Sequence, residues 1–176
     1  MTFDHDTEAS LVAAVELVNS AEEPDTLTEI AQLAEFFARH GYTGVHAGTA
    51  EELAAVRALR EPLRRMLTSD RESAVRLVNE TLAEHRAVPQ LARHGDVDYH
   101  IHATPTSAPL PVRIAVETAM AMVDVIRFDE MSRLSLCADS TCAGIVLDLS
   151  RNRSRRYCST ACGNRNAVAA YRARQK

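Results

Sequence analysis

The 176-residue sequence contains no tryptophan, and aromatic residues make up only 5% of it. A hydrophobic core must therefore be built mainly from leucine, valine, alanine and methionine. Hydrophobic residues account for 46% of the chain and charged residues for 25%, which indicates a folded soluble protein and excludes an intrinsically disordered one.

Long apolar runs are also missing. The most apolar long stretch, residues 114–126, is too short to span a bilayer and contains Glu117 and Asp124. The first ten residues, MTFDHDTEAS, lack the basic and apolar regions of a signal peptide. We therefore expect a cytoplasmic protein with no membrane partner. In that compartment four cysteines indicate metal ligands or catalytic thiols rather than disulfides.

The sequence has no phosphate-binding loop, nucleophile elbow or paired-histidine metalloprotease motif. No other convergent acid, base and nucleophile set is evident, so we expect a protein that is not an enzyme.

Acidic residues are absent from residues 151–176, which hold eight of the 20 basic residues. The remaining 12 basic residues face all 24 acidic residues, so an acidic body precedes a basic C-terminal piece. This division of charge predicts that the basic piece meets a polyanion.

The hydrophobic periodicity predicts a mainly helical first part. Helices are expected over 8–20, 26–40, 49–69 and 70–86, with Pro62 kinking or dividing the third. Gly95-Asp96 between two short runs predicts a β-hairpin within 88–104. Prolines at 109 and 111 suit the start of a long helix reaching about residue 132. No linker follows, so we expect this helix to couple the two parts mechanically.

Cys137, Cys142, Cys158 and Cys162 are spaced C-x4-C-x15-C-x3-C. Two close pairs at this separation are typical of a tetrahedral site for one structural Zn²⁺, with no open position for catalysis. Strands over 144–149 and 155–157, followed by a helix, would give a treble-clef-like finger. A redox dithiol pair or plain buried thiols are the alternatives.

The residues around these cysteines make the prediction more specific. The run from Asp148 to Arg165, DLSRNRSRRYCSTACGNR, resembles the CGNR zinc-finger family, named for the motif at Cys162-Gly163-Asn164-Arg165. That family usually carries an N-terminal helical domain called ABATE, and Leu17-Val18-Asn19-Ser20 is similar to its early signature. The resemblance implies a stress-related transcription regulator.

We therefore predict an α+β protein with two domains. Residues 1–132 form a mainly helical, ABATE-like domain with a small antiparallel hairpin, which senses a small-molecule effector or forms a homodimer. Residues 133–176 form the four-cysteine finger, which binds duplex DNA and regulates transcription. The alternative is a protein-interaction adaptor whose finger does not bind DNA specifically.

The arginines of the basic piece are the predicted nucleic-acid contacts, because arginine neutralises phosphates and forms bidentate bonds with guanine. They are Arg151, Arg153, Arg155, Arg156, Arg165, Arg172 and Arg174. A solvated basic face is the alternative. Arg165 lies beside the zinc ligands, so it either contacts DNA or stabilises the finger.

A ligand pocket is predicted between the hairpin and the helices, with Asn19, His100 and His102 as lining candidates. Buried Asn and His side chains with structural roles are the alternative. His94, His100 and His102 could together bind a second metal, although the sequence implies no acidic ligand beside them.

Overall fold

The computed structural model describes residues 3–94 and 97–175, except for the side chains of residues 94, 97 and 98. We call residues 3–128 the body and residues 133–175 the finger. Within the described residues, the body comprises α1 (His5–Asn19), α2 (Ile30–Arg39), α3 (Ala50–Ala58), α4 (Arg60–Thr68), α5 (Arg71–Glu84), β1 (Gln90–His94), β2 (Val97–His102) and α6 (Leu110–Arg127). A 3-10 turn (Met131–Arg133) leads into the finger, which contains β3 (Leu134–Leu136), β4 (Ile145–Leu147) and α7 (Thr160–Arg174).

The helix boundaries follow local signals. The Thr49 hydroxyl accepts the Glu52 N–H (3.2 Å) at the start of α3, and the Asp70 carboxylate accepts the Ser73 N–H (3.0 Å) at the start of α5. The predicted helix over 49–69 is divided at Leu59, which leaves Pro62 in the first turn of α4, where proline is tolerated.

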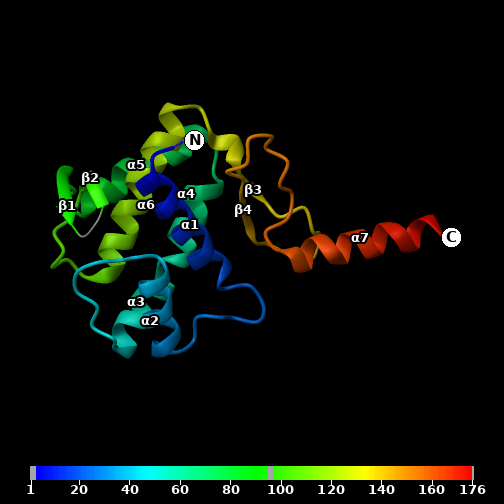
Figure 1. Ribbon diagram of the computed structural model, residues 1–176, viewed down its shortest axis with the longest axis horizontal. Helices are drawn as coiled ribbons and strands as arrows, with labels where there is room; N and C mark the ends of the chain where they lie inside the picture. The colour runs from blue at the N-terminus through cyan, green and yellow to red at the C-terminus, as the bar shows by residue number, and fades with distance from the viewer. Residues whose placement is uncertain (1–2, 95–96, 176) are drawn as a thin grey trace.

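The core of the body lies around α6, which packs against both α1 and α5 (Figure 1). Leu11, Leu17, Ile114 and Met122 are fully buried there, so aliphatic side chains and methionine fill the interior. The mainly helical fold class with small two-stranded sheets is confirmed. No helix of the described residues combines the length and apolarity that a membrane crossing requires.

One sequence prediction about the join between the body and the finger is wrong. The long helix ends at Arg127 rather than near residue 132, because Asp129 adopts a left-handed conformation (φ 58°) and turns the chain. The finger is therefore not a continuation of α6. Figure 1 instead shows β3 and β4 beside the body, with α7 extending away from the rest of the molecule.

The partner of β4 also differs from the prediction. Leu134, Ser135 and Leu136 of β3 pair antiparallel with β4, whereas residues 155–157 form no strand. The cause is the buried Asp148 carboxylate, which accepts the N–H groups of Ser150 (2.8 Å) and Arg155 (2.6 Å) and folds residues 148–155 into a loop.

Candidate metal centre and basic surface

The four cysteines converge from three parts of the finger. Cys137 follows β3, Cys142 precedes β4, and Cys158 and Cys162 lie at the start of α7. All four sulfur atoms lie within 4.8 Å of one another, with 3.5 Å between Cys142 and Cys158 and 3.7 Å between Cys158 and Cys162. Tetrahedral zinc with Zn–S bonds of about 2.3 Å requires sulfur separations of about 3.8 Å. The cluster has the dimensions of such a site.

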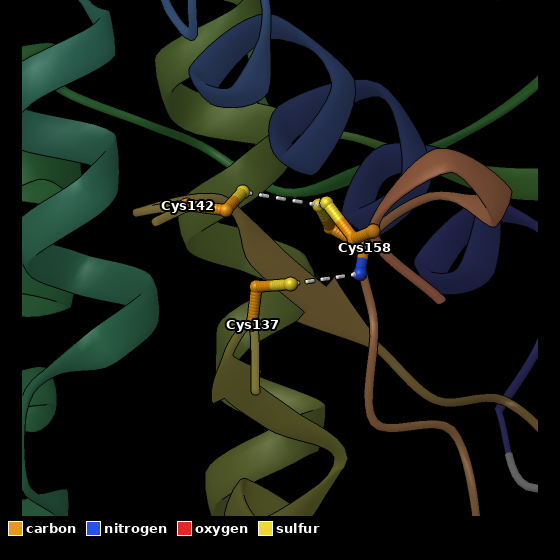
Figure 2. A group of neighbouring side chains, drawn as sticks. Cys137, Cys142 and Cys158 are labelled. Atoms are coloured by element: carbon orange, nitrogen blue, oxygen red, sulfur yellow. Dashed lines mark hydrogen bonds between the residues drawn. The ribbon is translucent and has the colours of Figure 1, made fainter. Parts of the chain in front are cut away.

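Backbone groups around the cluster are arranged to receive thiolates. The Gly144 N–H points at Cys142 Sγ (3.3 Å), and the Cys158 N–H points at Cys137 Sγ (3.5 Å). Figure 2 shows this second contact, and the sulfurs of Cys142 and Cys158 facing one another. Donors directed at sulfur partly balance the negative charge that four thiolates bring to a metal ion. The donor set therefore fits zinc.

The start of α7 also favours negative charge on the cysteine sulfurs. The Ser159 hydroxyl accepts the Cys162 N–H (3.2 Å) and caps the helix, whose N-terminal dipole favours negative charge. The side-chain interaction of the Ser159 hydroxyl with the sulfur lowers the pKa of the Cys162 thiol, whereas burial raises the pKa of Cys142 and of Cys158. A bound Zn²⁺ would supply the charge that keeps all four thiols deprotonated.

Gly144 leaves no room for a side chain beside the sulfurs. A Cβ atom there would lie 2.9 Å from Cys158 Sγ and 3.2 Å from Cys142 Sγ. We expect Gly144→Ala to weaken zinc binding by about tenfold or more, because overpacking of this size costs about 1–3 kcal/mol and displaces two ligands. Titration against a colorimetric zinc chelator measures the change.

Gly163→Ala is the matched control, because its added Cβ would come no closer than 3.6 Å to the Tyr157 ring. This variant should bind zinc like the unmodified protein and gain about 1 kcal/mol of helix stability. Equal zinc affinities of the two alanine variants would contradict the steric interpretation of Gly144.

Side chains of the body hold the segment between Cys142 and β4. The Asn19 carboxamide donates to the Ile145 carbonyl (2.8 Å) and accepts the Ile145 N–H (2.7 Å). Glu22 accepts the Ala143 N–H (3.1 Å), and Arg64 donates to the Ala143 carbonyl (2.5 Å) while pairing with Glu22 (3.0 Å). The first half of the cysteine cluster is therefore positioned by α1, α4 and the turn after α1.

Residues 11–128, more than half of the chain, match the ABATE family, whose description is "Putative stress-induced transcription regulator". The chain belongs to the ABATE family. Residues 133–175 match the CGNR zinc finger, so both predicted resemblances are confirmed. The search of curated proteins found no significant match.

Seven arginines of the CGNR finger are predicted to contact nucleic acid. Three of them instead form ion pairs or hydrogen bonds within the protein. Arg153 pairs with Glu130 (2.7 Å), and Arg155 donates to the carbonyls of Tyr157 and Cys158 (3.3 and 3.1 Å). Arg165 pairs with the buried Asp139 (2.8 Å) and donates to Cys162 Sγ (3.1 Å), although 54% of its side chain is exposed. These three arginines stabilise the loop and the cysteine cluster.

The other four arginines, Arg151, Arg156, Arg172 and Arg174, are exposed and form no ion pair within the described part of the chain. Arg156 lies over the Tyr157 ring, 6.0 Å from its centre. Arg151 lies on the loop after β4, and Arg172 and Arg174 lie in the last turn of α7. Their charge is available to a partner.

The predicted pocket residues lie in different cavities. His100 lines a cavity of about 610 Å³ between α1, β2 and α6, and both His100 and His102 line an adjoining one of about 240 Å³. Asn19 instead lines a cavity of about 570 Å³ between α1 and β4 of the CGNR finger. The side chain of His94 lies outside the described part of the structure. Among the described side chains, only the four cysteines cluster tightly enough to hold a metal ion.

The sequence interpretation missed Glu22, Arg64, Asp139 and Glu117. The neighbouring sequence gives no sign of the roles of Glu22 and Arg64, because each forms a hydrogen bond with Ala143, which lies more than 70 residues away in the chain. Asp139 carried one usable signal: it is an acidic residue between the first two cysteines, 26 residues before the arginine that it binds. The sequence marks Glu117 only as a charge inside the most apolar stretch, residues 114–126.

Proposed function

We propose that the protein is a zinc-dependent DNA-binding transcription regulator that acts in the cytoplasm. One structural zinc ion bound by Cys137, Cys142, Cys158 and Cys162 fixes the finger, and the finger's arginines contact duplex DNA. The ABATE region senses a small molecule or forms a homodimer. Membership of a family described as transcription regulators supports this proposal.

The observation that carries the proposal is the exposure of α7. This 15-residue helix extends away from the body (Figure 1), and Cys162 is its only fully buried residue within the described chain. An α-helix with side chains is about 10–12 Å across, and the major groove of DNA is about 12 Å wide. Arg172 and Arg174 at its far end are placed to neutralise phosphates.

A change in the ABATE region can reach the finger through packing. Asn19, Glu22 and Arg64 hold residues 143–145, and Ile145 and Leu147 belong to the same buried core as the helices of the body. A shift of α1 therefore moves β4 and the cysteine cluster with it. This route replaces the predicted one through a continuous long helix.

Selection from random duplex DNA tests the proposed function. Zinc-loaded protein is expected to enrich a defined sequence, and protein stripped of metal by a chelator is expected to enrich none. Enrichment that survives removal of the metal would contradict a zinc-dependent function.

Replacing both Arg172 and Arg174 with alanine should weaken binding to any duplex. Loss of two phosphate contacts is expected to reduce the slope of log K against log salt concentration by about 1.8. Fluorescence anisotropy across a salt series measures this slope. The control is Arg65→Ala with Arg76→Ala, which removes the same charge from exposed positions on α4 and α5. Equal slopes for the two double variants would contradict a DNA contact at α7.

A protein-interaction adaptor is the second candidate function. It is favoured by Val168 and Tyr171, which are 48% and 58% exposed and lie three residues apart on α7. Exposed apolar side chains at that spacing form one face that could meet a partner helix. Failure to enrich any DNA sequence, together with weak binding at physiological salt, would favour this function over the first.

A further inference from the structure

The ABATE region contains a cavity at the N-terminal end of α1, whereas Asn19, which binds the finger, lies at the other end of that helix. It has a volume of about 610 Å³ and lies between the first turns of α1, β2 and one face of α6. The adjoining cavity of about 240 Å³ shares six lining residues with it, Glu117 and His100 among them. Cavities of about 300–1,000 Å³ are the size that small organic ligands occupy.

The polar lining of this cavity is predominantly acidic. Asp4 precedes α1 as its N-cap residue and Asp6 lies in its first turn, and Glu117 and Asp124 lie two turns apart on α6. Arg127 is the one side chain of the lining that carries a permanent positive charge. The carboxylates on α1 also offset the positive end of that helix, which would otherwise favour an anion.

Glu117 interacts electrostatically with Arg113 and His100 but is not held by a hydrogen bond from a described residue. Asp124 accepts a hydrogen bond from the Thr7 hydroxyl (2.8 Å), whereas the Glu117 carboxyl group has no hydrogen bond among the described residues. Burial raises the pKa of Glu117 to about 7, against the opposing effect of Arg113. A largely buried carboxyl group facing a cavity is stabilised in its charged form by a cation that enters the cavity.

Apolar groups form the rest of the wall. Ile101 of β2 and Met120 and Ala121 of α6 lie on it, so a ligand there can bury hydrocarbon as well as charge. A bare metal ion does not suit these walls, and the described side chains here do not form a metal-binding cluster.

We propose that this cavity binds a small organic cation, an ammonium or amidinium group carried on an apolar body. The charged head lies against Glu117 and Asp6, and the apolar body lies against Ile101 and Met120. Binding of a cation at this site does not depend on the proposed function. An effect of the bound cation on DNA binding would deepen the proposed function and rests on it. That effect would travel along α1, whose other end holds the finger through Asn19.

Three probes of nearly equal size test the charge preference: benzylamine, benzyl alcohol and benzoate. Each is titrated at millimolar concentration into full-length, zinc-loaded protein without DNA, and amide and methyl resonances are followed by NMR. Benzylamine is expected to shift signals from the first turn of α1, from β2 and from the Glu117 face of α6. Benzyl alcohol and benzoate should bind at least about tenfold more weakly, because benzyl alcohol carries no positive charge and benzoate is repelled by the carboxylates of the lining.

Glu117→Gln keeps the shape of the side chain and should weaken benzylamine binding by about tenfold. Asp6→Asn is the second variant and should weaken it in the same direction. Glu61→Gln, an exposed carboxylate on α4, is the matched control and should leave binding unchanged. Equal binding of benzoate, no binding of benzylamine, or unchanged binding in a folded Glu117→Gln variant would overturn the proposal. Because no DNA is present, none of these results depends on whether the finger binds DNA.

Discussion

Substitution of Cys162 with serine is expected to abolish stoichiometric zinc binding and, with it, the fold of the finger. The small core of the finger consists of Cys137, Val146 and Cys162, with Tyr157 and the other two cysteines packed against it. A cluster this small cannot offset the conformational entropy of about 40 residues, so the metal must supply most of the stability. Structural zinc in finger peptides contributes about 10–16 kcal/mol. Elemental analysis measures the loss of zinc. The affinity for DNA measures the consequence for the proposed function.

The effect should extend into the body. Ile145 and Leu147 of β4 are buried in the core that the body helices share, so we expect the finger and the body to unfold as one unit. Removal of zinc by a chelator is therefore expected to lower the melting temperature of the whole chain in a single transition. The control is Ala161→Ser, which introduces the same residue at an exposed position beside Cys162. A folded Cys162→Ser variant that still binds one zinc per chain would contradict the four-cysteine site.

Features that depend on nearby residues could be predicted from the sequence. The caps at Thr49 and Asp70 bind N–H groups only three residues away, and Pro62 acts within its own turn of helix. The cysteine cluster was also predictable, because the chemistry of zinc restricts both the ligand type and the spacing of the pairs. The resemblance to the CGNR zinc-finger family rested on the same segment, whereas the resemblance to ABATE rested on residues 17–20.

Features that depend on distant partners could not be predicted. Residues 155–157 have a plausible strand pattern. In the structure, however, the Arg155 N–H donates to the Asp148 carboxylate and is therefore not available to pair with a neighbouring strand. Arg153 and Arg172 look alike in sequence, and only the fold shows that Glu130 lies beside the first. Counting charges therefore predicts a basic surface. It does not distinguish the arginines that form ion pairs within the protein from those that form none among the described residues.

Asn19 shows the same limit most clearly and leads to the second large prediction. The sequence made it a candidate pocket residue with a structural role as the alternative. Asn19 does line a cavity, and its carboxamide also forms two hydrogen bonds with Ile145, as a neighbouring strand would. Asn19→Ala leaves the N–H and the carbonyl of this buried residue without those partners. Each unsatisfied buried group costs about 1–3 kcal/mol, so the packing of the finger on the body should weaken by about 2–6 kcal/mol. Gly144, which donates to a ligand sulfur, is the adjacent residue.

Zinc affinity should therefore fall by about 30-fold to 20,000-fold in Asn19→Ala if the whole loss is expressed in zinc binding, although Asn19 touches no sulfur. Competition with a chelator measures the affinity, and hydrogen exchange of residues 142–147 shows whether the segment has loosened. Asn19→Asp keeps the acceptor for the Ile145 N–H and loses the donor, so its effect should be intermediate. Asn79→Ala, at an exposed position on α5, is the matched control and should change neither measurement. If Asn19→Ala binds zinc as tightly as this control, α1 does not position the cysteine cluster, and the proposed route from the ABATE region to the finger fails with it.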